Sequence, residues 1–245
     1  EMVLADDNFA SIARAVKEGR TVYQNLRKSI QFILPTNGAQ AGVIIAAILF
    51  GLTLPITPVQ ILWVNMVTAV TLALTLAFEP SERQIMRRPP RNASTPILDG
   101  FLLWRIALVS SVLIVGTVGV FLWELAREET LEASRTAAVN ALVVGQIFYL
   151  LSVRQDLSAA WLKESLSGNH WVFGSIGAVL ILQLLFTYAG PMNTLFGTAP
   201  TDILAWAWAL MVGLSVFVAV ESEKAWRRRG YREVTKVGAG LTSHQ

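Results

Sequence analysis

The sequence predicts an all-α protein: an integral membrane bundle of six transmembrane helices, the first extended beyond the membrane as a cytoplasmic stalk. Hydrophobic residues make up 53% of the 245-residue chain and charged residues only 15%, whereas a typical soluble domain has about 25%. The mean hydropathy is +0.51. Six apolar runs are each close to the ~20 residues that a helix needs to cross a bilayer, and loops of contrasting charge separate them.

The apolar runs follow one another with mostly short connections. They cover about residues 29–50, 58–78, 101–123, 135–153, 171–189 and 203–220, and the fourth is the most polar. In residues 9–28, apolar side chains recur near a 3.6-residue period among charged ones, which predicts an amphipathic helix. Asp6, Asp7 or Asn8 can cap this helix, and we expect it to continue into the first span without a break.

Basic residues lie almost entirely on one side of the expected bundle. Of the 20 Lys and Arg residues, only Arg127 and Arg135 fall in connections that an alternating topology assigns to the other side. The positive-inside rule then places both termini in the cytoplasm, as an even number of spans requires. We therefore expect a multi-pass protein of the plasma membrane, of the bacterial inner-membrane type, with the lipid bilayer as a partner. The arginines at 227–229 follow the last span directly and indicate a lipid-headgroup anchor, so no nucleic-acid partner is expected.

The first two expected spans carry amide and hydroxyl side chains where lipid would favour only carbon. They are Thr36, Asn37 and Gln40 in the first run, and Asn65, Thr68 and Thr71 in the second. Residues three apart share a helix face, which pairs Asn37 with Gln40 and Asn65 with Thr68. Because the turn at residues 51–58 is short, the two spans should be antiparallel neighbours, and these four side chains can converge. Pro35 removes a backbone donor, so side-chain oxygens and freed carbonyls predict a site for an alkali or alkaline-earth cation.

The same side chains have a second interpretation, because amides also hold transmembrane helices together. Composition excludes a thiolate or histidine-rich metal centre, since the chain has no cysteine and only His170 and His244; the only metal expected is the transported cation. The chain has no Gly-rich phosphate loop of the Walker type, and we assign no catalytic residue to it. Near the end of the last span, Glu221 can reach water or pair with Lys224 or Arg227.

Several separate segments resemble one family. Residues 4–9 read Leu-Ala-Asp-Asp-Asn-Phe, residues 15–20 read Ala-Val-Lys-Glu-Gly-Arg, and residues 58–68 read Pro-Val-Gln-Ile-Leu-Trp-Val-Asn-Met-Val-Thr. Glu79-Pro80 and the run Ile-Met-Arg-Arg-Pro-Pro-Arg at residues 85–91 follow. In this order and spacing they resemble P-type cation-transporting ATPases of the calcium and sodium/potassium pump branch. The clear match covers residues 3–100, and the rest agrees in hydropathy and span count.

The resemblance implies that the chain holds the end of the phosphorylation domain and transmembrane helices five to ten of a pump. Asn37 and Gln40 would stand at ion-ligand positions of helix five, Asn65 and Thr68 at those of helix six, with Asn140 and Gln146 as weaker candidates from helix eight. The cytoplasmic loop that couples ATP hydrolysis to transport would contain Glu79, Pro80, Arg87, Arg88, Pro89, Pro90 and Arg91.

The resemblance also implies partners and cofactors outside this chain. A full-length pump would hydrolyse ATP with Mg²⁺ through an aspartyl-phosphate, and would supply its own N-terminal helices and cytoplasmic domains. Neither the D-K-T-G-T nor the G-D-G-x-N-D segment of the family occurs here, so we expect this chain to bind neither cofactor and to hydrolyse no ATP alone. The implied division is 1–28 for the end of the phosphorylation domain and the stalk, 29–78 for the ion-site hairpin, 79–100 for the coupling loop, 101–221 for a four-helix bundle and 222–245 for a basic cytoplasmic tail.

Two positions depart from the calcium-pump pattern. Those pumps typically have Glu where Gln40 stands and Asp where Ala69 stands. Without these carboxylates the dehydration of a divalent ion is poorly offset, so a two-calcium site is not expected. A monovalent ion, a single divalent ion helped by the missing fourth helix, or an organic cation remain open. A passive channel or secondary transporter predicts internal repeats that the chain lacks, and a non-catalytic scaffold or regulatory fragment is the further alternative.

Overall fold

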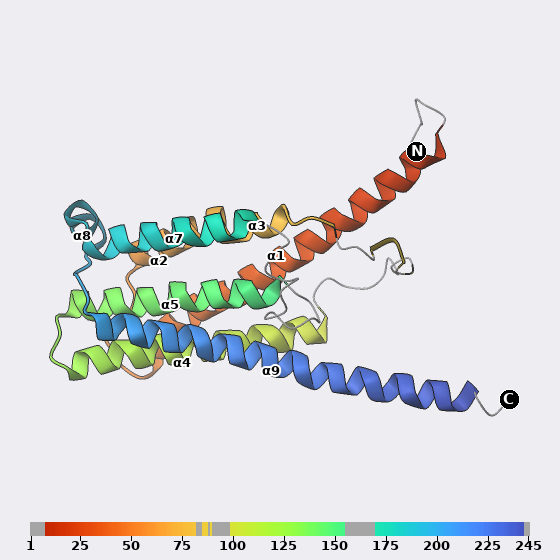
Figure 1. Ribbon diagram of the computed structural model, residues 1–245. Helices are drawn as coiled ribbons and strands as arrows, with labels where there is room; N and C mark the ends of the chain where they lie inside the picture. The colour runs from red at the N-terminus through yellow and green to blue at the C-terminus, as the bar shows by residue number, and fades with distance from the viewer. Residues whose placement is uncertain (1–7, 82–84, 88, 90–98, 155–169, 243–245) are drawn as a thin grey trace.

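The computed structural model describes residues 8–81, 85–87, 89, 99–154 and 170–242, and within these ranges it is all helical, without a strand (Figure 1). The helices in chain order are α1 (Phe9–Leu49), α2 (Pro58–Thr68), the π-helical turn η1 (Ala69–Ala73), α3 (Leu74–Ala77), the 3₁₀ turn η2 (Ile85–Arg87), α4 (Gly100–Ala126), α5 (Leu131–Val153), α7 (His170–Tyr188), α8 (Gly190–Phe196) and α9 (Ile203–Thr242). The predictions for residues 1–7, including the capping roles of Asp6 and Asp7, concern residues outside the described ranges.

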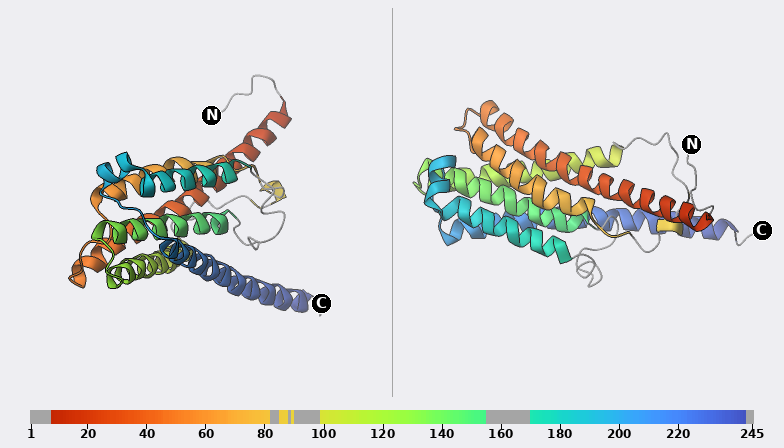
Figure 2. Two further views of the ribbon diagram at one scale, coloured as in Figure 1. Left: turned by 60° about the vertical axis from the view of Figure 1, so that its left-hand side comes forward. Right: turned by 90° about the horizontal axis from the view of Figure 1, so that it is seen from above.

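Six helices are long and apolar enough to cross a membrane, which confirms the expected fold class. The chain enters the bundle along α1 and leaves it along α9, and both helices project from the same end of the molecule in all three views (Figures 1 and 2). We call this the termini end. The connections at residues 50–57, 127–130 and 197–202, together with α8, form the opposite, loop end (Figure 1).

The first helix runs unbroken from the stalk into the bundle, as expected. The side chain of Asn8 caps it by accepting a hydrogen bond from the Ala10 N–H at 2.9 Å. Two glycines thin one face of the helix. A Cβ on Gly38 would lie 2.7 Å from Ser110 Oγ, and one on Gly42 would lie 2.2 Å from Ile114 Cδ1. The helix that approaches closely at these two glycines is α4.

The fourth span, α5, occupies the centre of the bundle. In its apolar segment 89% of the residues are buried, against 28–50% for the other five spans. The helix packs against α1, α2, α4, α7 and α9. Small residues allow this, because a Cβ on Gly145 would lie only 2.4 Å from Leu113 Cδ2. The most polar span lies innermost, where neighbouring helices rather than lipid can satisfy its polar groups.

The second span departs from the single helix expected over residues 58–78. It begins with a capping box, in which the Thr57 side chain accepts from the Gln60 N–H and the Gln60 side chain accepts from the Thr57 N–H. At Ala69 the α-helix gives way to the π-helical turn, and α3 completes the span. Single π-helical turns inside α-helices frequently mark functional sites. Two further differences lie elsewhere: α8 occupies part of the last loop, and α9 continues as a helix through most of the expected tail.

Candidate functional site

The six hydroxyl and amide residues predicted on the first two spans differ in their exposure. Thr36, Gln40 and Thr68 are buried, Asn65 and Thr71 are half-buried, and Asn37 is exposed on the bundle surface. The helix α1 contacts the second span mainly at η1 and α3, and its contact with α2 is marginal. Since α5 contacts both α1 and α2, the surroundings of the predicted site are made by three helices rather than by two facing ones.

The threonines of the predicted site donate to carbonyls of their own helices. Thr36 donates to the Phe32 and Ile33 carbonyls, each at 3.0 Å. Thr68 donates to the Val64 carbonyl at 2.8 Å, and Thr71 bonds to the Val67 carbonyl. These bonds use the hydroxyl hydrogen only, and each oxygen keeps acceptor capacity for a cation.

Gln40 is the most distinctive of the predicted ligands. Its side chain is 4% exposed, and its Nε2 has no hydrogen-bond partner within the described part of the chain. An unsatisfied buried amide costs about 1–3 kcal/mol. A group that remains in such a position therefore marks a place where something further binds, such as water, an ion-water cluster or another part of a longer protein.

The carbonyl freed by Pro35 already accepts a hydrogen bond from a neighbouring helix. Proline has no N–H, so the Gln31 carbonyl, four residues earlier, loses its partner within α1. The Tyr149 hydroxyl on α5 donates to it at 2.6 Å. The Pro35 carbonyl in turn accepts from Ser110 on α4 at 2.8 Å. The backbone around the proline therefore ties α1 to its neighbours.

A second polar cluster lies between α2, α5 and α7. Asn140 Oδ1 accepts from Gln183 Nε2 at 2.6 Å and from Thr187 Oγ1 at 3.2 Å, and Trp63 Nε1 lies 3.5 Å from Gln183 Oε1. The predicted ligand Asn140 thus already bonds across helices through its oxygen. The sequence analysis missed Gln183 and Thr187, although their spacing of four residues in an apolar run places both on one helix face.

Gln146, the other weaker candidate, has a different environment. It is fully buried, and neither amide atom has a hydrogen-bond partner among the described residues. Six residues separate it from Asn140, which on a helix is a rotation of about 240°. The two candidates on α5 therefore face different sides of that helix and do not form one ligand pair.

The predicted coupling loop begins in a buried ionic cluster. Glu79 lies between Lys28 of α1, with Oε2 to Nζ at 3.5 Å, and Arg154 after α5, with Oε1 to Nε at 2.5 Å. Asn25 donates to the carbonyls of Ala77 at 3.1 Å and Glu79 at 2.7 Å. These contacts join the end of the second span to the stalk.

A second contact lies further along the loop. Arg20 donates to the Ile85 carbonyl at 2.9 Å, and Ile85 is buried. Pro80, Arg87 and Pro89 are exposed, whereas Arg88, Pro90 and Arg91 lie outside the described residues. Arg27 of the stalk also pairs with Asp99 near the end of the loop at 3.1 Å. The described part of the loop therefore meets the stalk at its start, at its 3₁₀ turn and near its end.

Further buried charges at the termini end are paired. Arg105 of α4 bonds to Glu223 of α9, and Lys224 lies 2.8 Å from Glu221 and donates to the Ser152 carbonyl at 2.5 Å. The pairing of Glu221 with Lys224 was one of the alternatives predicted. No group of three or more His, Cys, Asp or Glu residues that could hold a metal ion occurs in the described ranges.

Comparison with known proteins establishes the class. Residues 53–226 match the family model described as "Cation transporting ATPase, C-terminus". The chain belongs to this family of membrane cation-transporting ATPases.

Individual relatives agree with the family. The chain is 45% identical over 223 residues to the "Probable cation-transporting ATPase F" of Mycobacterium tuberculosis, covering 91% of this chain and 24% of the relative. It is 41% identical to the "Cation-transporting ATPase pma1" of Synechocystis, covering 86% and 24%. It is 33% identical to the "Calcium-transporting ATPase" of Bacillus subtilis, covering 87% and 24%. The chain thus spans about a quarter of the length of these relatives.

Proposed function

We propose that this chain is the C-terminal membrane part of an ATP-driven cation pump, and that Gln40, Asn65 and Thr68 contribute ligands to the transported cation. Asn37 joins them only if the rest of the pump covers the exposed face of α1. The observation that carries the proposal is the burial of Gln40, whose Nε2 has no hydrogen-bond partner in the described part of the chain. It lies on the helix that contacts the π-helical turn directly after Thr68, where a local change of helix geometry can change the ligand set.

The same proposal assigns a role to each segment of the chain. Residues 29–78 supply ion ligands, and residues 79–100 with the stalk at 1–28 carry the movement of the ATP-hydrolysing domains to them. The ion pairs of Glu79 with Lys28 and Arg154 support this coupling role. Residues 101–221 hold the hairpin in place, and residues 222–245 anchor the termini end at the cytoplasmic face. ATP and Mg²⁺ would be bound by the remaining three quarters of the protein.

The ion that we propose is a single cation held mainly by neutral oxygens. One relative is named as a calcium transporter, but Gln40 and Ala69 leave the hairpin without carboxylates at two positions. Two adjacent divalent ions would repel each other by several kcal/mol, even at an effective dielectric constant of about 20, and neutral ligands do not compensate this. The proposal therefore favours a monovalent ion, one divalent ion or an organic cation over a pair of calcium ions.

The test uses the full-length protein, purified and reconstituted in vesicles. ATP hydrolysis is measured with Na⁺, K⁺, Mg²⁺, Ca²⁺ or a polyamine as the stimulating cation. Gln40→Ala and Asn65→Ala should lower the apparent affinity for the active cation by about tenfold, the equivalent of ~1.4 kcal/mol. Gln24→Ala, an amide on the same helix outside the apolar run, should leave this affinity unchanged. If neither site variant changes the affinity, the amides are structural and the ion-ligand proposal fails.

A further inference from the structure

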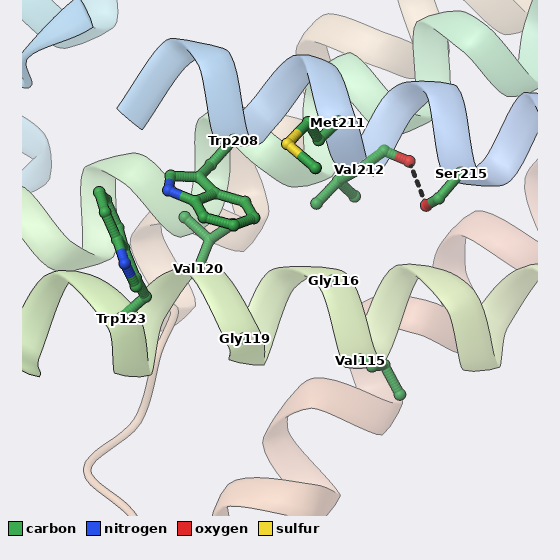
Figure 3. A pocket seen from close by; sticks show the side chains of 9 residues that line it. All are labelled: Val115, Gly116, Gly119, Val120, Trp123, Trp208, Met211, Val212 and Ser215. Atoms are coloured by element: carbon green, nitrogen blue, oxygen red, sulfur yellow. Dashed lines mark hydrogen bonds between the residues drawn. The ribbon is translucent and has the colours of Figure 1, made fainter. Parts of the chain in front are cut away.

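A groove between α4 and α9 stands apart from the predicted ion site. It has a volume of about 360 Å³ and runs along both helices beside residues such as Val115, Gly119 and Met211 (Figure 3). Its lining is almost entirely apolar; the one hydroxyl, of Ser215, already donates to the Val212 carbonyl at 2.7 Å. Val115 and Met211 are exposed on the bundle surface. In a membrane such a groove opens to the hydrocarbon, and an apolar chain can fill it without loss of hydrogen bonds.

The shape of the groove depends on a glycine. A Cβ added at Gly119 would meet no atom within 4 Å, whereas one at Gly116 would lie 2.6 Å from Val212 Cγ1. Gly116 therefore permits the two helices to approach, and Gly119 leaves space open. Because a larger residue at 119 could be accommodated without moving either backbone, the open space is not required for packing α4 against α9.

Two tryptophans close the groove at the loop end. Trp123 of α4 and Trp208 of α9 lie with their ring centroids 5.3 Å apart, and both line the groove (Figure 3). Tryptophan is enriched where the hydrocarbon meets the headgroups of a membrane. An acyl chain in this groove would therefore have its headgroup beyond the Trp pair.

The headgroup position carries an excess of carboxyl groups. The Arg127 guanidinium lies over the Trp123 ring at 4.7 Å and bonds to Asp202 at 2.8 Å. Glu124 Oε2 lies 3.4 Å from Arg127 Nη1. The negative charge of Glu129 acts on both Glu124 and Arg127. Arg135, the next basic residue along the chain, lies near the start of α5 and is directed elsewhere, since its Nε donates to the Leu54 carbonyl at 3.0 Å.

One of these carboxyl oxygens lacks a donor. Glu124 is 3% exposed, and its Oε1 has no hydrogen-bond partner in the described ranges. It follows Val120, which lines the groove, by one helical turn, and is itself not among the residues that line the groove. A carboxylate in this position needs an N–H donor with positive charge, and an anionic headgroup would be repelled.

From these contacts we infer that the α4–α9 groove binds one acyl chain of a phospholipid whose headgroup carries a primary ammonium. Phosphatidylethanolamine has this chemistry. Its ammonium supplies three N–H donors, which a choline headgroup lacks and a glycerol headgroup replaces with neutral hydroxyls. The lipid would lie in the leaflet at the loop end, with the ammonium at Glu124 and the chain over Gly119.

The test measures lipid contact at Trp208 in the full-length protein, reconstituted in phosphatidylcholine vesicles. Phospholipids with dibrominated chains and ethanolamine, glycerol or choline headgroups are each titrated over the same range of mole fractions. The quenching of Trp208 is obtained as the difference in fluorescence quenching between the parent protein and the Trp208→Phe variant. The ethanolamine lipid should quench at about two- to fivefold lower mole fraction than the glycerol lipid, the range that a single partly exposed ion pair supports.

Three variants separate the chain from the headgroup. Gly119→Leu should at least halve the quenching, while Gly174→Leu, at an exposed glycine of α7 that also has open space, should leave it unchanged. Glu124→Gln should abolish the headgroup preference but keep the quenching. Equal quenching by ethanolamine and glycerol lipids would overturn the headgroup assignment. Two results would overturn the lipid site itself. One is an absence of quenching, which is expected if a protein segment covers the groove. The other is quenching that Gly119→Leu does not change.

Discussion

The Tyr149 hydroxyl donates a hydrogen bond to the Gln31 carbonyl at 2.6 Å, and both residues are buried. Gln31 needs this donor because Pro35 supplies no N–H four residues later. A side chain of the central helix α5 therefore completes the backbone hydrogen bonding of α1.

Tyr149→Phe should destabilise the protein, because it leaves the Gln31 carbonyl buried without a donor at a cost of about 1–3 kcal/mol. The measurement is the midpoint of thermal inactivation of the full-length protein in detergent. Pro35→Ala restores an N–H within α1, so Tyr149→Phe should cost less in a Pro35→Ala background. Tyr188→Phe is the matched control, since its hydroxyl donates to the Thr201 carbonyl at an exposed position where water can replace it. Equal losses in both backgrounds would contradict the account of Pro35.

Glu79→Gln should weaken the coupling of ATP hydrolysis to transport. The substitution removes the buried charge that lies between Lys28 and Arg154, and breaking a buried ion pair typically costs about 3–5 kcal/mol. The expected result is a lower number of ions transported per ATP hydrolysed, measured in sealed vesicles. Asp99→Asn provides the control, because its ion pair with Arg27 is about one-third exposed and an exposed pair contributes about 1 kcal/mol or less. A similar loss in both variants would argue against a specific role for Glu79.

Gln40→Glu should raise the apparent affinity of the full-length pump for a divalent cation by about tenfold, since a charged ligand binds such an ion more strongly than a neutral one. ATP hydrolysis as a function of Ca²⁺ concentration measures the change. Gln60→Glu, at a fully buried glutamine whose Nε2 contacts the Phe196 and Gly197 carbonyls at the loop end, is the comparison. If Gln40→Glu leaves the Ca²⁺ dependence as it was, residue 40 does not contact the ion.

Acid should weaken the contact between α4 and α9 at the loop end. The hydrogen bond from Arg127, with the N–H of Ala205, lowers the pKa of Asp202 below its usual value. A carboxylate with a lowered pKa stabilises the fold above its unfolded pKa of about 3.9, and this contribution is lost as the pH falls through the lower folded pKa. The effect is small because the pair is exposed to solvent. Thermal inactivation measured from pH 6 to pH 3 should show an acid-dependent decrease that Asp202→Asn reduces, since Asn keeps the helix cap but not the charge.

The six spans and the long stalk could be predicted because they depend on local sequence, namely apolar runs of the right length and a continuous helical period. The fourth run is the most polar in the sequence, and the structure places it at the centre of the bundle. The short turn after α1 predicts a contact with the second span, and α1 does contact η1 and α3. The more extensive contact of α1 with α4 was not predictable. Gly38 and Gly42 face α4, and only tertiary packing decides which neighbour uses such a face.

The hydrogen bonds and ion pairs around the site could not be predicted from the sequence either. Tyr149 lies 118 residues from Gln31, and Arg154 lies 75 residues from Glu79. Asparagine, tyrosine and arginine at such separations have no periodicity that relates them. The π-helical turn at Ala69–Ala73 likewise leaves no signal in the apolar pattern, since residues of the same type continue through it.

The length of α1 has a mechanical consequence. A helix of 41 residues is about 60 Å long at ~1.5 Å per residue, roughly twice the thickness of the hydrocarbon core. In a membrane, about half of it would therefore extend beyond the hydrocarbon core, and the ion pair of Lys28 with Glu79 lies near the start of this half. A tilt of about 10° would displace the far tip of an arm of ~30 Å by about 5 Å, so a modest rotation at the base is amplified into a step as large as one helical turn.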